Sequence, residues 1–421
     1  MKKAVFKTSL AVASILGATI AGTTLASAQL GNGTPPIDNG PDKGELSVAA
    51  DPDGFTPFAV NTGPGLSRLP LTTEEAVPIG ESREAVPDLG KSGSSKDSLY
   101  EKEAVGTHAT QWPYATARVA ITGIPGPGTG TLAVPVTSKP FRLTGKLWMR
   151  FGSSWFVCTA SLIKRGVLIT AAHCVHNYGQ QGNGWADEVR WYPANFGPSG
   201  PGNAGGPWGY YNGRQWRILF PYWNGTDTCQ AGSIGVVCNN DIATVVLYAK
   251  GGKLPGETLG GWYGYGWNGY SFPTSPAFGN NRVAAITQLG YPSAFDLGRQ
   301  MQRNDSFGKL IVAQGANGKT LLNTQLGSSL TGGSSGGPWL VNFGTRTNIT
   351  DTSSATRGSA NSSNIVVGVT SWGYTNINSN VQGASWFGQN AEYPNANYGG
   401  RGAGNIGALM MGTCNAFPAH C

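Results

Sequence analysis

The stretch "LTGGSSGGPWL", residues 330–340, places two adjacent serines between two glycine pairs. Glycine pairs on both sides indicate a chain that turns sharply or approaches another group closely. A serine hydroxyl becomes a strong nucleophile only when a base takes its proton. A glycine-rich turn can also direct two backbone N–H groups at one oxyanion. The stretch therefore predicts a nucleophile together with its oxyanion site, although an ordinary glycine–serine loop is the alternative.

A histidine that could take the serine proton lies far upstream. The chain has four histidines, which are His108, His173, His176 and His420. His173 follows the apolar run "GVLIT", which predicts a strand, and it precedes Cys174, whose disulfide could pin the turn. A general base must be held within about 3 Å of its proton. His173 is therefore the predicted base, whereas His176 lacks this anchor; a structural histidine is the alternative.

A carboxylate is expected to orient that histidine. Asp241 begins "DIATVVLY", an apolar run that predicts a buried strand, three residues after Cys238. A carboxylate that enters a buried strand needs a hydrogen-bonding partner, because burial of an unpaired charge is costly. A histidine ring N–H would supply this partner and fix the tautomer of the ring. The alternatives are a capping role for Asp241, and Asp227, in the loop-like "NGTDTC", as the histidine's partner.

The elements that must hold these side chains in place are predicted to be β-strands. The chain has 421 residues, 64 of them glycine, and only 12% are charged, which suits a folded protein with a sizeable core. Short apolar runs such as "SWFVCTASLI", "KLIVAQG" and "NIVVGVTSWG" are bounded by turn-forming residues, and no long stretch has helical periodicity. The sequence therefore predicts an all-β fold, a sandwich or barrels.

The candidate residues occur in the order His, Asp, Ser, and with their flanking motifs they resemble a known family. The motifs are "TAAHC" at 170–174, "DIATVVL" at 241–247, "GSSGGP" at 333–338 and "TSWG" at 370–373. Over residues 140–375 the chain resembles the chymotrypsin-like (trypsin-like) serine proteases, and looks closest to the secreted bacterial branch that includes the glutamyl endopeptidases. The resemblance implies that Ser335 is the nucleophile, with oxyanion N–H groups from Gly333 and Ser335.

The same resemblance implies a fold and a substrate site. The fold would be two perpendicular six-stranded antiparallel β-barrels, with the reacting residues between them. Ser371, Trp372 and Gly373 would lie along the cleft, where the strand pairs with the substrate backbone. Ser329, six residues before the nucleophile, would form the floor of the specificity pocket. Because residues 306–350 and 365–391 contain no Asp or Glu, we expect a neutral pocket for apolar or aromatic side chains.

Ser334 departs from the family pattern, which has an aspartate at this position. In the animal digestive enzymes of the family, that aspartate pairs with the newly freed N-terminal amine. A neutral serine cannot form this ion pair, so we expect removal of a leader to unblock the site rather than to build a buried salt bridge. Acetylation of the mature N-terminus should then leave activity nearly intact.

The N-terminal region is expected to be removed. Residues 1–28 have the basic start, short apolar run and "ASA" ending of a secretory signal peptide. Residues 29–110 have a net charge of −7 and predict a weakly ordered, acidic pro-segment, with a plain spacer as the alternative; residues 111–421 have a net charge of +11. We expect a first barrel with His173 and Asp241 over 111–258. A second barrel over 259–421 would contain Ser335 and end in a disulfide-linked segment.

The six cysteines predict disulfides. Fifteen pairings are conceivable, but neighbours in the sequence form three close pairs. These pairs are Cys158 with Cys174, Cys229 with Cys238, and Cys414 with Cys421. The pair at 158 and 174 also resembles the family's histidine-loop disulfide. A metal site is disfavoured, because CxxC spacing is absent and only one histidine lies near the cluster.

The residues together predict a secreted serine endopeptidase with a protein or peptide substrate and no metal or organic cofactor. The pro-segment would serve as its inhibitor or chaperone, and we expect a monomer outside the cell, or in the periplasm if the host has an outer membrane. The basic residues are scattered, which argues against nucleic-acid binding, and no mature stretch predicts a membrane span. The alternatives are an inactive binding protein or adhesin that uses the aromatic–glycine stretch 260–270, and an esterase.

Overall fold

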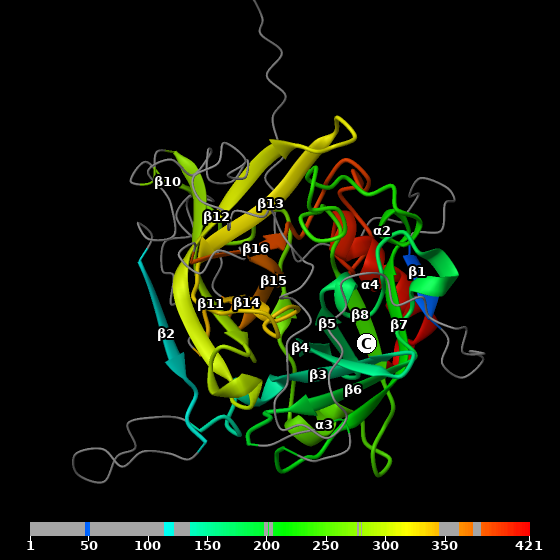
Figure 1. Ribbon diagram of the computed structural model, residues 1–421, viewed down its shortest axis with the longest axis vertical. Helices are drawn as coiled ribbons and strands as arrows, with labels where there is room; N and C mark the ends of the chain where they lie inside the picture. Colours follow the sequence, from blue (N-terminus) through cyan, green and yellow to red (C-terminus); the bar gives the residue numbers. More distant parts are fainter. Residues whose placement is uncertain are drawn as a thin grey trace, which may run out of the picture. The chain divides into compact units, whose positions relative to one another are not determined.

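The computed structural model describes residues 47–50, 113–121, 135–197, 201, 205–275, 278, 280–344, 362–373 and 380–421. The predicted signal peptide, 1–28, lies outside these residues, as does His108. The predicted pro-segment, 29–110, also lies outside them apart from residues 47–50. Within the described residues the structure is mostly β, with short helices at the connections and one longer helix near the C-terminus (Figure 1).

Six antiparallel strands form the first barrel. They are β3 (Thr144–Phe151), β4 (Ser154–Lys164), β5 (Val167–Thr170), β6 (Glu188–Pro193), β7 (Tyr211–Leu219) and β8 (Ala243–Leu247). Their order is β7-β6-β3-β4-β5-β8, and a further pairing between β7 and β8 closes the sheet. Closure leaves few free strand edges within the barrel.

The second barrel is also a closed set of six antiparallel strands. They are β11 (Asn281–Gly290), β12 (Gln302–Gln314), β13 (Thr320–Gly327), β14 (Pro338–Val341), β15 (Ile365–Gly373) and β16 (Val381–Ser385). Their order is β11-β14-β15-β16-β13-β12, and pairing between β11 and β12 completes the ring. The short strands β9 (Gly264–Tyr265) and β10 (Thr274–Ser275) add to β15 and β11. The predicted pair of six-stranded barrels is therefore confirmed.

Two strands from the N-terminal part of the chain extend these sheets. β1 (Ser47–Ala50) lies in the predicted pro-segment and pairs antiparallel with β7 of the first barrel. β2 (Tyr114–Arg118) pairs with β12 of the second barrel, although its range was expected to belong to the first. The apolar and β-branched residues that predict strands do not specify the sheet that an edge strand joins.

The C-terminal segment packs on the first barrel rather than on the second. Helix α4 (Gly404–Ala416) contacts β7 and β8, and Thr413 Oγ1 lies 2.7 Å from Thr244 Oγ1. The helix ends before Pro418, because a proline disfavours helical geometry in the residue that precedes it. The disulfide between Cys414 and Cys421 closes the last turn. Two further short helices are α2 (Phe220–Asn224) and α3 (Pro255–Leu259).

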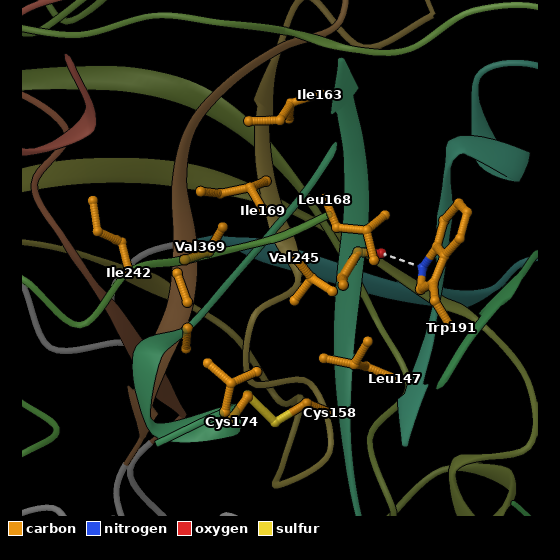
Figure 2. Close-up of a cluster of buried hydrophobic side chains, with 14 of the residues drawn as sticks. Leu147, Cys158, Ile163, Leu168, Ile169, Cys174, Trp191, Ile242, Val245 and Val369 are labelled. Carbon is orange, nitrogen blue, oxygen red and sulfur yellow. Dashed lines mark hydrogen bonds between the residues drawn. A yellow bond between two sulfur atoms is a disulfide. The ribbon is translucent and has the colours of Figure 1, made fainter. Parts of the chain in front are cut away.

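The interior of the first barrel is filled by side chains that alternate inward along the strands. Leu147 from β3, Leu168 from β5 and Val245 from β8 converge with Trp191 from β6 (Figure 2). Trp191 Nε1 donates a hydrogen bond to Ala160 O at 3.1 Å, so the large ring is buried with its polar atom satisfied. The strand that leads toward His173 is therefore anchored in a packed core.

All six cysteines form disulfides, in the three sequence-local pairs that were predicted. The pair Cys158–Cys174 joins β4 to the turn that follows β5, beside the core (Figure 2). In the part of the chain that the structure describes, no helix is long and apolar enough to cross a bilayer.

Candidate active site

His173 lies in a short turn between two fixed points. β5 runs through the core to Thr170, and the one-turn helix η3 (Ala172–Cys174) follows directly. Cys174 is bonded to Cys158 of β4, so the chain is held on both sides of the histidine. The His173 side chain is 1% exposed. The predicted anchoring of this residue is confirmed, because a strand end and a disulfide both restrain its backbone.

Asp241 holds His173 through two hydrogen bonds. His173 Nδ1 lies 2.7 Å from Asp241 Oδ2, and the His173 backbone N–H donates to Asp241 Oδ1 at 2.8 Å. The carboxylate can only accept, so the ring proton lies on Nδ1 and the lone pair on Nε2. Nε2 is buried and has no hydrogen-bond partner among the described residues. The ring is therefore oriented with its basic nitrogen free to take a proton.

Two serines support Asp241, which is itself fully buried. Ser371 Oγ contacts Asp241 Oδ2 and lies 2.8 Å from Val236 O. Ser385 Oγ accepts the Asp241 backbone N–H at 3.0 Å and donates to Cys238 O at 2.7 Å. Both serines belong to the second barrel, whereas Asp241 precedes β8 of the first. The carboxylate thus sits where the two barrels meet, and its burial is compensated by the backbone N–H and ring Nδ1 of His173 and by the hydroxyl of Ser371.

Asp227, the alternative partner for the histidine, has a different role. Its carboxylate accepts hydrogen bonds from Asn240 Nδ2 at 2.7 Å and from the Asn240 backbone at 2.9 Å. Burial and the nearby Glu392 carboxylate raise the pKa of Asp227 well above its ordinary value, against these two bonds. Asp227 therefore braces the residue that precedes Asp241 rather than the imidazole.

Ser335 lies in a turn that is fastened to the first barrel. Thr159 of β4 holds the turn twice: its N–H donates to Ser335 O at 2.7 Å, and its hydroxyl donates to Gly333 O at 2.8 Å. Gly336, at φ +78°, has no room for a side chain, because a Cβ would collide with Thr170 Oγ1 and Thr159 O. Thr170 is three residues before His173, so the glycine brings the serine turn against the histidine segment. A hydrogen bond between Ser335 Oγ and His173 Nε2 stays a prediction.

This arrangement decides the fold. One closed six-stranded barrel carries His173 and Asp241, and a second carries Ser335 and the two serines that contact Asp241. The chain has the chymotrypsin-like double-barrel fold. Within it, Gly333 has a φ of +90°, a conformation that favours glycine, two residues before the predicted nucleophile.

Comparisons with known proteins give only partial matches. No family model matches the chain. The extracellular metalloprotease of Bacillus subtilis (strain 168) is 30% identical over 131 residues, which are 31% of this chain and 34% of that protein. The chain therefore spans about a third of the length of this relative.

Two solved structures are similar over most of their own length. A thermostable serine protease, AL20, from an extremophilic microorganism is 22% identical, with a TM-score of 0.41, covering 59% of this chain and 92% of that one. The protease Anisep from Arthrobacter nicotinovorans is 19% identical, with a TM-score of 0.40, covering 60% of this chain and 93% of that one.

The predicted substrate-strand residues lie at the end of β15. The register of β15 against β16 shifts between Thr370 and Trp372, so Ser371 occupies a β-bulge. Trp372 is 2% exposed, and its Nε1 donates to Asn323 Oδ1 at 2.8 Å. Gly373, which ends the strand, is only partly buried. The contact of Ser371 with Asp241 could not be found from sequence, because it depends on the bulge.

Ser329 faces the N-terminal strand of the second sheet. Its Oγ lies 2.8 Å from Thr116 Oγ1 of β2. It lines a cavity of about 660 Å³ together with residues of β2 and of the 294–296 segment. An ion pair between Arg118 and Asp296 lies on the wall of this cavity. The role of Ser329 as the floor of a specificity pocket stays a prediction.

His176 is a buried structural residue. Its ring packs edge-on against Trp185 at 4.5 Å between centroids, and Nε2 lies 2.8 Å from Gln181 O. Burial lowers the pKa of His176 from its ordinary 6.5 to about 4. Both histidines follow the same strand, and the sequence feature that distinguishes them is Cys174, which lies beside His173 and forms a disulfide with Cys158.

Acid should destabilise the protein through His176. The unfolded state binds the proton near pH 6.5 and the folded state near pH 4, so stability is present above pH 6.5 and lost as pH falls through 4. We expect this group to cost about 3 kcal/mol between pH 7 and pH 4. Urea unfolding of Ser335→Ala protein, which cannot digest itself, measures the loss. His176→Gln in that background should lose correspondingly less, and an equal loss would contradict the assignment.

Proposed function

We propose that this chain is a secreted serine endopeptidase that hydrolyses peptide bonds through an acyl-enzyme. The observation that carries the proposal is the buried pair of His173 and Asp241, with Nδ1 and Oδ2 2.7 Å apart and Nε2 unpartnered among the described residues. A ring oriented in this way is suited to act as a general base toward a hydroxyl. The glycine-rich turn of Ser335, fastened beside the histidine segment, offers that hydroxyl.

The proposed chemistry has two halves. Ser335 Oγ attacks the carbonyl carbon of the scissile bond, its proton moves to His173 Nε2, and the carbonyl electrons move onto the oxygen. The backbone N–H groups of Gly333 and Ser335 stabilise this oxyanion. His173 then gives the proton to the amine as the C–N bond breaks, leaving an acyl group on Ser335. Water repeats the steps and releases the acid, while Asp241 remains ionised and stabilises the imidazolium.

The substrate would extend the second barrel. An extended peptide can add to the end of β15 through main-chain hydrogen bonds, along Ser371, Trp372 and Gly373. Residues 306–350 and 365–391 contain no Asp or Glu, so we expect a preference for apolar or aromatic side chains at the cleaved position. In the cavity that Ser329 lines, the charges of Arg118 and Asp296 are paired with each other. Two observations support a location outside the cytoplasm. The chain has three disulfides, which persist in oxidising compartments, and it is similar over part of its length to an extracellular metalloprotease of Bacillus.

A catalytic metal fits these residues poorly, although the Bacillus relative is named a metalloprotease. Two clusters of potential ligands occur among the described residues, and each includes two cysteines, Cys158 with Cys174 in one and Cys229 with Cys238 in the other. Both pairs are disulfides, so their sulfurs are not thiolates, the form that binds metals. The mechanism that we propose therefore uses no metal ion.

A serine-directed sulfonyl fluoride tests the proposal. It should abolish peptide hydrolysis by the secreted protein and add its sulfonyl group to Ser335, as located by peptide mass spectrometry. His173→Ala should be labelled at least about 100-fold more slowly, because the hydroxyl would have lost its base. Labelling at Ser334 instead would overturn the assignment of the nucleophile.

The same experiment separates the alternatives. A binding protein or adhesin on this scaffold would not be labelled and would not cleave a peptide library. An esterase would be labelled but would turn over only ester substrates. Loss of activity in a metal chelator, with no effect of the sulfonyl fluoride, would instead support metal-dependent hydrolysis.

A further inference from the structure

Two buried glutamine side chains lie behind the turn that carries Ser335. Gln382 comes from β16 and Gln288 from β11, and they are 4% and 0% exposed. The two side chains are joined, because Gln288 Nε2 donates to Gln382 Oε1. Buried amides are costly unless their hydrogen-bonding groups are all used, so the partners of each atom are informative.

All the hydrogen-bonding groups of the Gln382 amide are used, in bonds to the turn and to Gln288. Its Nε2 donates to Leu330 O at 2.6 Å and to Ser334 Oγ at 3.1 Å, and its Oε1 accepts from Gln288. Both amide hydrogens and the amide oxygen therefore have partners. Ser334 Oγ in turn donates to Thr331 O at 2.5 Å, which closes the turn on itself.

Gln288 connects the Gln382 amide to the chain on both sides of the turn. Its Oε1 accepts from Ser328 Oγ at 2.8 Å, and Ser328 Oγ also accepts the Leu330 N–H at 3.1 Å. Its Nε2 also donates to Thr370 Oγ1 at 2.8 Å. Thr370 O accepts the Gly336 N–H at 2.6 Å. The two amides thus join the chain before the turn to the chain just after Ser335.

Every partner in this network is uncharged. Gln382 and Gln288 face β15, β11 and the 328–334 segment, and the groups that meet them there are carbonyls, hydroxyls and amides. No titratable side chain is among these partners in the described residues. The shape of the turn is therefore held without an ion pair.

We propose that Gln382 is a positioning residue for catalysis, which holds the 330–335 turn so that the N–H groups of Gly333 and Ser335 point at one oxyanion. Gln288 fixes the orientation of the Gln382 amide. The inference rests on the proposed function and extends it. It also assigns Ser334 a structural role, because its hydroxyl is used within the turn. The turn needs no buried charge, so a free N-terminal amine is not required to form it.

Gln382→Met tests the positioning role, because methionine has nearly the same volume and no amide. We expect kcat for a peptide substrate to fall by about 10- to 100-fold while KM changes by less than about threefold, since the oxyanion forms only in the transition state. Gln325→Met is the matched control, a buried glutamine on the adjacent strand β13 whose Oε1 has no hydrogen-bond partner among the described residues. Equal losses in the two variants would overturn a specific role for Gln382.

Gln382→Glu adds a readout that a merely structural role would not change. Protonated, the new acid can donate to Leu330 O; ionised, it would face that carbonyl oxygen without a proton. Its kcat/KM should therefore fall as pH rises from 6 to 9, whereas the wild-type and Gln325→Met profiles stay flat over the upper part of this range. A profile parallel to the wild type would count against the proposal. This variant also serves if Gln382→Met fails to fold.

Acetylation of the N-terminal amine of the active secreted form completes the test. Activity should stay within about twofold of the untreated enzyme, and a loss above about tenfold would show that a charged terminus is needed after all. If the proposed endopeptidase function were wrong, the result would differ from that of a wrong positioning role. In that case the wild type itself would neither cleave peptides nor be labelled at Ser335. An active wild type with an equally active Gln382→Met variant would refute only the positioning role.

Discussion

Ser335→Ala should lower kcat/KM for a peptide substrate by about 10⁴- to 10⁶-fold. The substitution removes the proposed nucleophile and leaves the bonds that hold the turn, because Thr159 binds the carbonyl of Ser335 and not its hydroxyl. Turnover of a chromogenic peptide measures the effect, and an unchanged thermal midpoint would show that the fold is intact. Residual activity within tenfold of the wild type would exclude Ser335 as the nucleophile.

Ser334→Ala is the matched comparison, since the two serines are adjacent. Ser334 Oγ has partners on both sides, Gln382 Nε2 and Thr331 O. Loss of these bonds should loosen the turn and reduce kcat by about tenfold or less, because a neutral hydrogen bond contributes about 1 kcal/mol. The difference between the two alanine variants identifies the serine that reacts. A larger loss of activity in Ser334→Ala than in Ser335→Ala would identify Ser334 as the nucleophile.

Asp241→Asn should lower kcat by about 10⁴-fold at neutral pH with little change in KM. The amide oxygen can still accept the His173 backbone N–H, while the new N–H₂ group faces Nδ1 and donates to it. The ring proton is then forced onto Nε2, and the ring has no lone pair for the serine hydroxyl. Kinetics together with NMR of the imidazole nitrogens would follow both the rate and the tautomer.

The control for this variant is Asp305→Asn, a partly exposed carboxylate that pairs with Arg303 on β12 and accepts a hydrogen bond from Thr287. This substitution should leave kcat within about twofold, because a solvent-accessible ion pair contributes little free energy and the amide oxygen can still accept from Thr287. Asp227→Asn is a poor control, since that carboxylate braces Asn240 beside the site. A loss in Asp241→Asn no larger than in Asp305→Asn would mean that the carboxylate does not orient the base.

Local signals in the sequence were sufficient for the strands and the disulfides. "GVLIT" and "IATVVL" are short apolar runs bounded by turn residues, and they form β5 and β8. The three disulfides close between cysteines that are at most 16 residues apart, so sequence proximity indicated the pairing. The pairing of His173 with Asp241 was also predicted, because a carboxylate at the start of a buried strand needs a partner.

Features that depend on long-range packing were missed. Helix α4 has no polar stripe, since "GNIGALMMGTCNA" is buried on nearly all sides, and so it lacks the periodicity by which helices are recognised. β2 crosses to the second sheet because its edge pairing with β12 is decided by the fold and not by its own residues.

The sequence by itself determined which groups could react and which elements would carry them, because side-chain chemistry, turn-forming glycines and apolar runs are local properties. Tertiary structure alone decided what each group meets. Ser371 reaches Asp241 only through a bulge, and Ser334 is held by Gln382 from a strand 48 residues away. Such contacts arise when two closed barrels bring distant strands together, and no local pattern encodes them.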